Sequence, residues 1–228
     1  MLWQREGWQN SAPVRAVIFD MDGVIFDTER LAETSWYMAA QRLGYKEMTH
    51  EVFLQTLGAP RESVHKALAA HFGENVDLEA MGKVRREAMD ELIAQEGMPI
   101  KAGFIELMGH LKGLGVKTAI ASATWQTRIR EYFVLANLDI DALFNAVISG
   151  DMVQRGKPAP DIFLKAAGDI GSAPGECIVI EDSFGGVRAG YDAGMRVIMV
   201  PDMLEPTQEV QRMLCARVDT LEDIIALI

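Results

Sequence analysis

Two aspartates that directly follow an apolar segment are the residues of this chain best suited to chemistry. Asp20 and Asp22 come after residues 14–19, whose apolar and β-branched side chains predict a buried strand. Open α/β folds place their active sites at the carboxyl ends of such strands. Two carboxylates this close repel each other unless a cation lies between them, and Mg²⁺ prefers carboxylate oxygens. An aspartate beside such an ion can attack phosphorus and form an aspartyl-phosphate.

An isolated pair of aspartates can also be a solvated loop or a helix cap, so later features matter. Residues 115–121 predict another strand, and Ser122 and Ala123 follow it, near the start of a helix expected over residues 124–135. A hydroxyl and unpaired backbone N–H groups at such a place can hold a phosphate. The alternative for Ser122 is an ordinary helix-capping serine.

Two further groups lie later in the chain. Lys157 stands in a proline-stiffened turn ahead of a helix expected from Asp161, where it could meet a phosphate oxygen or a nucleophilic carboxylate; alternatively, it is a surface lysine. Glu181 and Asp182 end a buried strand expected over residues 177–180, and a glycine-bearing loop follows. Asp182 could complete an oxygen shell for the metal, or it could cap the next helix.

The order of these four groups resembles the haloacid dehalogenase-like phosphohydrolase superfamily, over nearly the whole chain after residue 13. Residues 19–29 are similar to the subgroup that contains β-phosphoglucomutase and sugar-phosphate phosphatases. The resemblance implies Mg²⁺ as cofactor and a small-molecule phosphate ester as substrate. It implies that Asp20 is the nucleophile and a metal ligand, and that Asp22 is the general acid and base with its carbonyl on the metal. It also implies that the phosphoryl group is bound by Ser122, Ala123 and Lys157. For the metal it implies Asp182 as a further ligand and Glu181 as a weaker candidate.

The composition fits one soluble globular protein. Of the 228 residues, 49% are hydrophobic and 24% are charged, and the formal net charge is −11. An acidic balance disfavours nucleic acid and anionic membranes as partners, because both attract basic surfaces. The chain shows no signal peptide and no apolar run long enough to span a bilayer, so a cytoplasmic enzyme is expected, as a monomer or weak dimer.

The pattern along the chain predicts an α/β fold with a doubly wound parallel sheet. Strands alternate with helices in residues 14–27 and 98–228, which are expected to form a Rossmann-like core ending in a helix over residues 221–228. Only helical periodicity appears in residues 28–97, which predicts a small all-helical cap domain. Residues 1–13 are expected to be an irregular N-terminal extension.

The cap is expected to choose the substrate. Gly58 and Arg61 are its candidate residues, since an arginine after a turn can bind a second anionic group; a solvated helix start is the alternative. The function expected is a Mg²⁺-dependent phosphatase acting on a small phosphorylated metabolite, with a sugar phosphate favoured. The alternative is a β-phosphoglucomutase-type mutase, but mutases carry a histidine shortly after the pair that corresponds to Asp27 and Thr28, and residues 29–33 contain none.

Three other classes fit less well. A dehalogenase would leave Asp22 without a task. Receiver-type signalling domains also carry a phosphorylatable aspartate, a serine and a lysine, but they are shorter and lack a helical insert. A catalytically inactive binding protein would not need every catalytic residue type that this chain retains.

Overall fold

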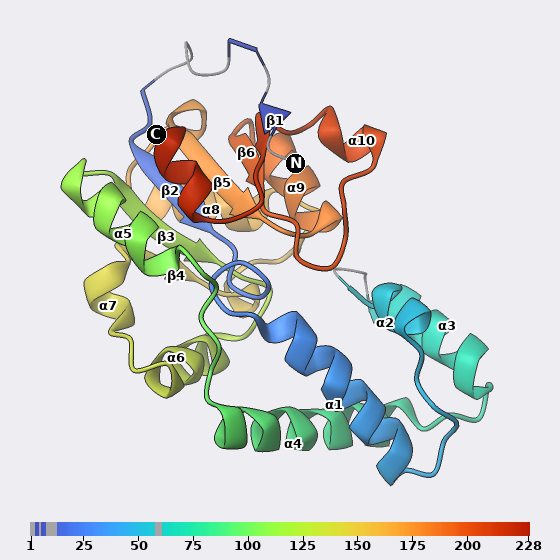
Figure 1. Cartoon of the computed structure of the whole chain (residues 1–228). Helices are drawn as coiled ribbons and strands as arrows, with labels where there is room; N and C mark the ends of the chain where they lie inside the picture. The colour runs from blue at the N-terminus through green and yellow to red at the C-terminus, as the bar shows by residue number, and fades with distance from the viewer. Residues whose placement is uncertain (1–2, 5, 8–12, 58–60) are drawn as a thin grey trace. The chain divides into compact units, whose positions relative to one another are not determined.

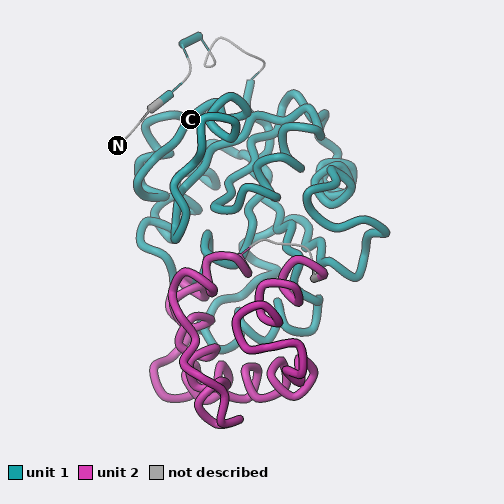
Figure 2. The backbone as a smooth tube through the Cα atoms, turned by 90° about the vertical axis from the view of Figure 1, so that its right-hand side faces the viewer, with its two compact units in different colours: residues 1–26, 100–228 teal, residues 27–99 magenta. Residues whose placement is uncertain are grey.

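The computed structural model describes residues 3–4, 6–7, 13–57 and 61–228, and the chain divides into two compact units. Unit 1 consists of residues 1–26 and 100–228, and unit 2 of residues 27–99 (Figure 2). The sequence placed the two changes of unit after residues 27 and 97. Since the chain leaves unit 1 after residue 26 and re-enters it at residue 100, unit 2 is an insertion in unit 1.

Unit 1 is built on a twisted sheet whose strands run in the order β1-β7-β6-β5-β2-β3-β4. All neighbouring strands are parallel except β1, which pairs antiparallel with β7. The strands are β1 (Trp3–Gln4), β2 (Ala16–Phe19), β3 (Lys117–Ala121), β4 (Ala146–Ile148), β5 (Cys177–Glu181), β6 (Arg196–Met199) and β7 (Ala216–Arg217). The chain passes from β2 to β3 and β4 on one side and then to β5 and β6 on the other, so β2 lies at the topological switch point where such folds bind ligands.

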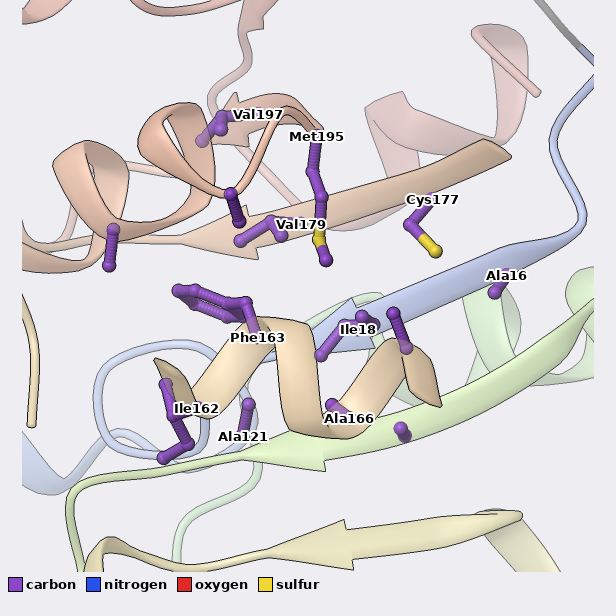
Figure 3. Close-up of a cluster of buried hydrophobic side chains, with 14 of the residues drawn as sticks. Ala16, Ile18, Ala121, Ile162, Phe163, Ala166, Cys177, Val179, Met195 and Val197 are labelled. Atoms are coloured by element: carbon purple, nitrogen blue, oxygen red, sulfur yellow. The ribbon is translucent and has the colours of Figure 1, made fainter. Parts of the chain in front are cut away.

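Helices cover both faces of this sheet, as the apolar strands require (Figure 1). On one face, α8 and α9 pack against Ile18 of β2 and Val179 of β5, and Figure 3 shows Phe163 of α8 beside both. On the other face, the Phe19 ring meets Phe104 of α5 edge to face, with centroids 6.1 Å apart. The helices of unit 1 are α5 (Phe104–Gly113), α6 (Gln126–Leu135), α7 (Ile140–Leu143), α8 (Asp161–Asp169), α9 (Phe184–Asp192) and α10 (Gln208–Gln211).

Unit 2 contains helices and no strand among its described residues, 27–57 and 61–99. Its helices are α1 (Thr28–Arg42), α2 (His50–Leu54), α3 (Arg61–Phe72) and α4 (Leu78–Glu96). The two long helices α1 and α4 pack along each other, and Asp77 caps α4 by accepting hydrogen bonds from Glu79 N and Ala80 N. A parallel, doubly wound α/β core with an all-helical insertion is therefore confirmed.

The structure differs from the sequence-based expectation in several short elements. Trp3–Gln4, within the segment expected to be irregular, forms β1. The helix expected over residues 221–228 is a 3₁₀ helix, Glu222–Ala226. Such pieces are too short to show a clear period, so the pattern does not reveal them. No helix formed by the described residues is long and apolar enough to cross a membrane.

Candidate active site

The carboxyl ends of the neighbouring strands β2 and β5 bring Asp20 close to Glu181. Their parallel register pairs Phe19 with Ile180, and Asp20 N donates a hydrogen bond to the Ile180 carbonyl at 3.0 Å. Asp20 is 7% exposed and Glu181 is fully buried. Two carboxylates withdrawn from water at one point of the sheet edge require positive charge beside them.

Lys157 supplies part of that charge from the segment that precedes α8. Its Nζ contacts Asp20 Oδ1 and lies 2.6 Å from Glu181 Oε1. The lysine side chain is 9% exposed, and its ammonium lies 4.9 Å from the centre of the Phe163 ring. Lys157 is therefore a buried ion-pairing lysine and not the surface residue that the sequence also allowed.

Glu181 is held by the loop that follows β5 as well as by Lys157. Its second oxygen, Oε2, accepts hydrogen bonds from Asp182 N at 3.0 Å, Ser183 N at 2.8 Å and Ser183 Oγ at 2.9 Å. Gly186 allows this position, because a Cβ atom there would lie 1.6 Å from Glu181 Oε1. These contacts favour a role for Glu181 in fixing Lys157 and the loop over a role as metal ligand.

Asp182 lies against the loop that carries Asp20 and Asp22. Gly23 in that loop has φ +75°, and a Cβ atom on it would lie 2.2 Å from Asp182 Oδ2. Only a glycine combines this backbone conformation with so close an approach. Asp182 does not cap α9, because Ser183 does so by accepting a hydrogen bond from Gly186 N.

Asp22 and Ser122 are connected through Thr124. Thr124 Oγ1 donates a hydrogen bond to Asp22 Oδ2 at 2.8 Å, and Thr124 N donates one to Ser122 Oγ at 3.1 Å. Ser122 is 1% exposed and directly follows β3, three residues ahead of Trp125, which is the N-cap residue of α6. Ser122 is thus not a helix-capping serine. With an acceptor site on its oxygen used by Thr124 N, its hydroxyl hydrogen is the part that can donate to a phosphate oxygen.

The electrostatics of this cluster favour an added cation. Burial raises the pKa of Asp20, and the neighbouring charges of Glu181 and Asp22 raise it further, although Lys157 acts in the opposite direction. The pKa of Lys157 is raised despite its burial, because Asp20 and Glu181 both favour its charged form. One ammonium group therefore faces several carboxylates, and a divalent cation would balance their negative charge.

The donor set suits a hard cation such as Mg²⁺. Among the residues that the structure describes, no three His, Cys, Asp or Glu side chains are grouped as ready-made metal ligands. A Mg²⁺ ion does not need three, since it usually keeps several waters and takes one or two carboxylates together with substrate phosphates. Asp20 and Asp182, at the ends of the adjacent strands β2 and β5, have carboxylates that fit that requirement.

The structure thus joins most of the residues singled out in the sequence by direct contacts within unit 1. Thr124 was missed, although its place two residues after Ser122 could have indicated a shared face in an extended segment. Ala123 is exposed beside Ser122. Of the two candidates expected in the cap, Gly58 lies outside the described residues and Arg61 is the first residue of α3.

Comparison with known proteins adds independent information. The family model described as "Haloacid dehalogenase-like hydrolase" matches residues 17–200. A Drosophila melanogaster protein named "Probable pseudouridine-5'-phosphatase" is 34% identical over 190 residues, which cover 81% of this chain and 80% of that protein. A Thermotoga maritima protein named "Phosphorylated carbohydrates phosphatase" is 31% identical over 185 residues, covering 81% of this chain and 84% of that protein.

A solved structure shows the same fold. The crystal structure of β-phosphoglucomutase from Clostridium difficile superimposes with a TM-score of 0.74, covering 92% of this chain and 93% of the other, at 23% identity. At this identity the likeness concerns the fold alone. Residues 17–200, the span that the family model matches, include all the contacts between Asp20, Asp22, Ser122, Thr124, Lys157 and Glu181 described above.

Proposed function

The chain belongs to the haloacid dehalogenase-like hydrolase family, and from that premise we propose that it is a Mg²⁺-dependent phosphatase working through an aspartyl-phosphate on Asp20. Within the family it is a phosphoric monoester hydrolase of the sugar-phosphate phosphatase and β-phosphoglucomutase-like subgroup. The observation that carries the proposal is the contact of the buried Lys157 ammonium with the Asp20 carboxylate. A lysine there can hold a phosphoryl oxygen as Asp20 attacks.

Each residue of the site has a task in this reaction. Asp20 Oδ attacks phosphorus, and the bond from phosphorus to the leaving oxygen breaks while Asp22 gives that oxygen a proton. Asp22 then takes a proton from the water that attacks the aspartyl-phosphate, and Asp20 is released. Ser122, the Ala123 N–H group and Lys157 bind the equatorial oxygens, where the transition-state charge develops.

A bound Mg²⁺ ion would supply further positive charge against the phosphoryl oxygens. Asp20, Asp182 and the Asp22 carbonyl are the residues that would hold it. Glu181 stays the weaker candidate ligand, because both of its oxygens already accept hydrogen bonds from Lys157 and the β5–α9 loop.

A sugar phosphate is the substrate class that we favour. The two relatives are named for pseudouridine-5'-phosphate and for phosphorylated carbohydrates, and both names describe phosphate esters of a sugar. Gly58 and Arg61 of unit 2 are proposed to contact the part of the substrate away from the transferred phosphate. A cytoplasmic location and a monomeric or weakly dimeric state stay predictions.

A sugar phosphomutase remains the alternative, since the fold is shared with β-phosphoglucomutase. The start of α1, Thr28 to Glu33, carries no histidine, whereas the mutases that this chain resembles carry one there that helps to position the catalytic acid. The absence of that histidine argues against a mutase, so water is the expected acceptor of the phosphoryl group.

The test is phosphate release from a panel of sugar phosphates, nucleoside monophosphates and phosphoglycolate, in Mg²⁺ and in EDTA. Glucose 1-phosphate would also be assayed for conversion to glucose 6-phosphate. Release that requires Mg²⁺ and is lost in Asp20→Asn, but is kept in the exposed control Asp192→Asn, supports the proposal. Isomer conversion with little free phosphate would make the protein a mutase.

A further inference from the structure

Thr124 has a direct contact with the proposed general acid that the reaction scheme above does not use. Its Oγ1 lies 2.8 Å from Asp22 Oδ2. We propose that Thr124 is the positioning residue for Asp22, holding one oxygen of the Asp22 carboxyl so that the other meets the leaving group. This inference rests on the proposed phosphatase function and adds to it a residue that controls proton transfer.

The backbone that carries the Thr124 hydroxyl is held by hydrogen bonds on both sides. Thr124 N donates to Ser122 Oγ at 3.1 Å, and the Thr124 carbonyl accepts a hydrogen bond from Gly150 N at 3.2 Å. Gly150 lies so close that a Cβ atom on it would be 2.3 Å from the Ala123 carbonyl oxygen. The segment from Ser122 to Thr124 is therefore held between the end of β3 and the turn at Gly150, which limits how far the Thr124 hydroxyl can move from Asp22.

The contact also connects the residue proposed to bind the phosphoryl group with the residue proposed to protonate the leaving group. Ser122 is proposed to bind the phosphoryl group, and Asp22 to protonate the leaving oxygen, so both must keep a fixed relation to phosphorus. Thr124 touches Ser122 through its backbone and Asp22 through its side chain. A hydrogen bond to one carboxylate oxygen restricts rotation of the carboxyl group, which keeps the other oxygen in hydrogen-bonding reach of the substrate.

A purely structural contact and a positioning contact predict different dependence on the leaving group. Protonation by Asp22 matters greatly when the leaving group is an alkoxide, as in an alkyl or sugar phosphate. It matters little for p-nitrophenyl phosphate, whose phenolate leaves readily without a proton. Loss of positioning should therefore reduce kcat/KM selectively for the alkyl ester, because kcat/KM covers the steps up to leaving-group release.

The experiment compares Thr124→Val, which keeps the shape and removes the hydroxyl, with Thr124→Ser, which restores it. Thr127→Val, at an exposed position in the first turn of α6, is the matched control. We expect Thr124→Val to lower kcat/KM for the alkyl ester about tenfold or more and for p-nitrophenyl phosphate less than about threefold. A hydrogen bond to the carboxylate that forms as Asp22 gives up its proton is of this strength. Thr124→Ser should recover most of the loss, and Thr127→Val should match the wild type.

The ratio of the two kcat/KM values does not depend on the fraction of folded enzyme, so a destabilised variant still gives an answer. Mg²⁺ binding, measured by the shift in unfolding temperature, should be the same in Thr124→Val as in the wild type. Equal losses for both esters, no loss at all, weakened Mg²⁺ binding, or a serine variant no better than valine would overturn the proposal. A wild-type protein inactive on both esters would instead contradict the proposed function itself.

Discussion

Lys157 Nζ lies 2.6 Å from Glu181 Oε1, and the Glu181 side chain is completely buried. This pairing keeps a counter-charge on the lysine whatever happens at Asp20. In the proposed reaction Asp20 loses its carboxylate charge when it becomes an aspartyl-phosphate, but Glu181 still holds Lys157 in place. The ammonium is then free to stay with the phosphoryl oxygens through both steps of the reaction.

Glu181→Gln should destabilise the protein although it replaces only one oxygen by an NH₂ group. The carboxylate accepts Lys157 on one oxygen and three donors on the other, whereas an amide has only one oxygen. Either orientation places an NH₂ group against a donor, which costs about 2 kcal/mol. Urea unfolding would measure this, with the more exposed Glu176→Gln as control. Equal midpoints for the two variants would contradict the role given to Glu181.

Gly186→Ala should disturb the same network from outside. The added Cβ would lie 1.6 Å from Glu181 Oε1, and the carboxylate cannot move without giving up its hydrogen bonds. We expect a loss of stability of about 1–3 kcal/mol and at least a tenfold fall in kcat. Gly168→Ala, in helix α8 with nothing within 4 Å of the new atom, is the matched control and should be neutral or slightly stabilising. An active and stable Gly186→Ala would show that the network is not required.

Mg²⁺ should stabilise the protein through Asp182. At a concentration one hundred times the dissociation constant, a ligand that binds only the folded state adds about 2.7 kcal/mol. We expect the unfolding temperature to rise with Mg²⁺ in the wild type and in Asp192→Asn, an exposed aspartate of α9, but not in Asp182→Asn. A full Mg²⁺ response in Asp182→Asn would remove this residue from the metal site.

Unit 2 should lose stability in acid through Glu33 of α1. Tyr37 Oη lies 2.5 Å and His50 Nδ1 2.7 Å from Glu33 Oε1. Burial alone would raise the pKa of Glu33, but the hydrogen bonds from Tyr37 and His50 outweigh it and lower the pKa below the ordinary 4.5. A carboxyl group whose pKa is lower in the folded than in the unfolded state stabilises the folded state at pH values above the unfolded-state pKa. This stabilisation is lost as the pH falls through the folded-state pKa.

Glu33→Gln should therefore be less stable than the wild type at pH 7, and the difference should shrink as the pH falls below 4.5. Thermal unfolding followed by circular dichroism at pH 7 and pH 3 measures the two differences. Comparing the variant with the wild type at each pH removes the effect of the other carboxylates. A difference that is the same at both values would show that the Glu33 charge does not contribute.

Much of the site could be predicted because it depends on strand ends. Asp20 and Asp182 each follow an apolar run, and the carboxyl ends of parallel strands share one edge of the sheet. Helical periodicity between residues 28 and 97, with glycines at the helix ends, was enough to identify an inserted helical unit. These features are local in the sequence, and the rules of parallel sheets then bring them together.

What could not be predicted depends on packing between distant segments. Lys157 is buried because it packs over the Phe163 ring, and Glu181 keeps its hydrogen bonds because Gly186 leaves room for its carboxylate. The contact of Thr124 with Asp22 joins residues 102 positions apart. No periodicity or spacing encodes such contacts, because they appear only once the strands are in register.

The central claim, that an enzyme carboxylate receives the phosphoryl group before water does, is tested most directly by the stereochemical course at phosphorus. The Mg²⁺-loaded enzyme would hydrolyse a phosphorothioate ester made chiral with oxygen isotopes. Two successive in-line displacements, first by Asp20 and then by water, predict net retention of configuration in the thiophosphate released. Net inversion would mean that water attacks the ester directly, and it would contradict the aspartyl-phosphate on Asp20.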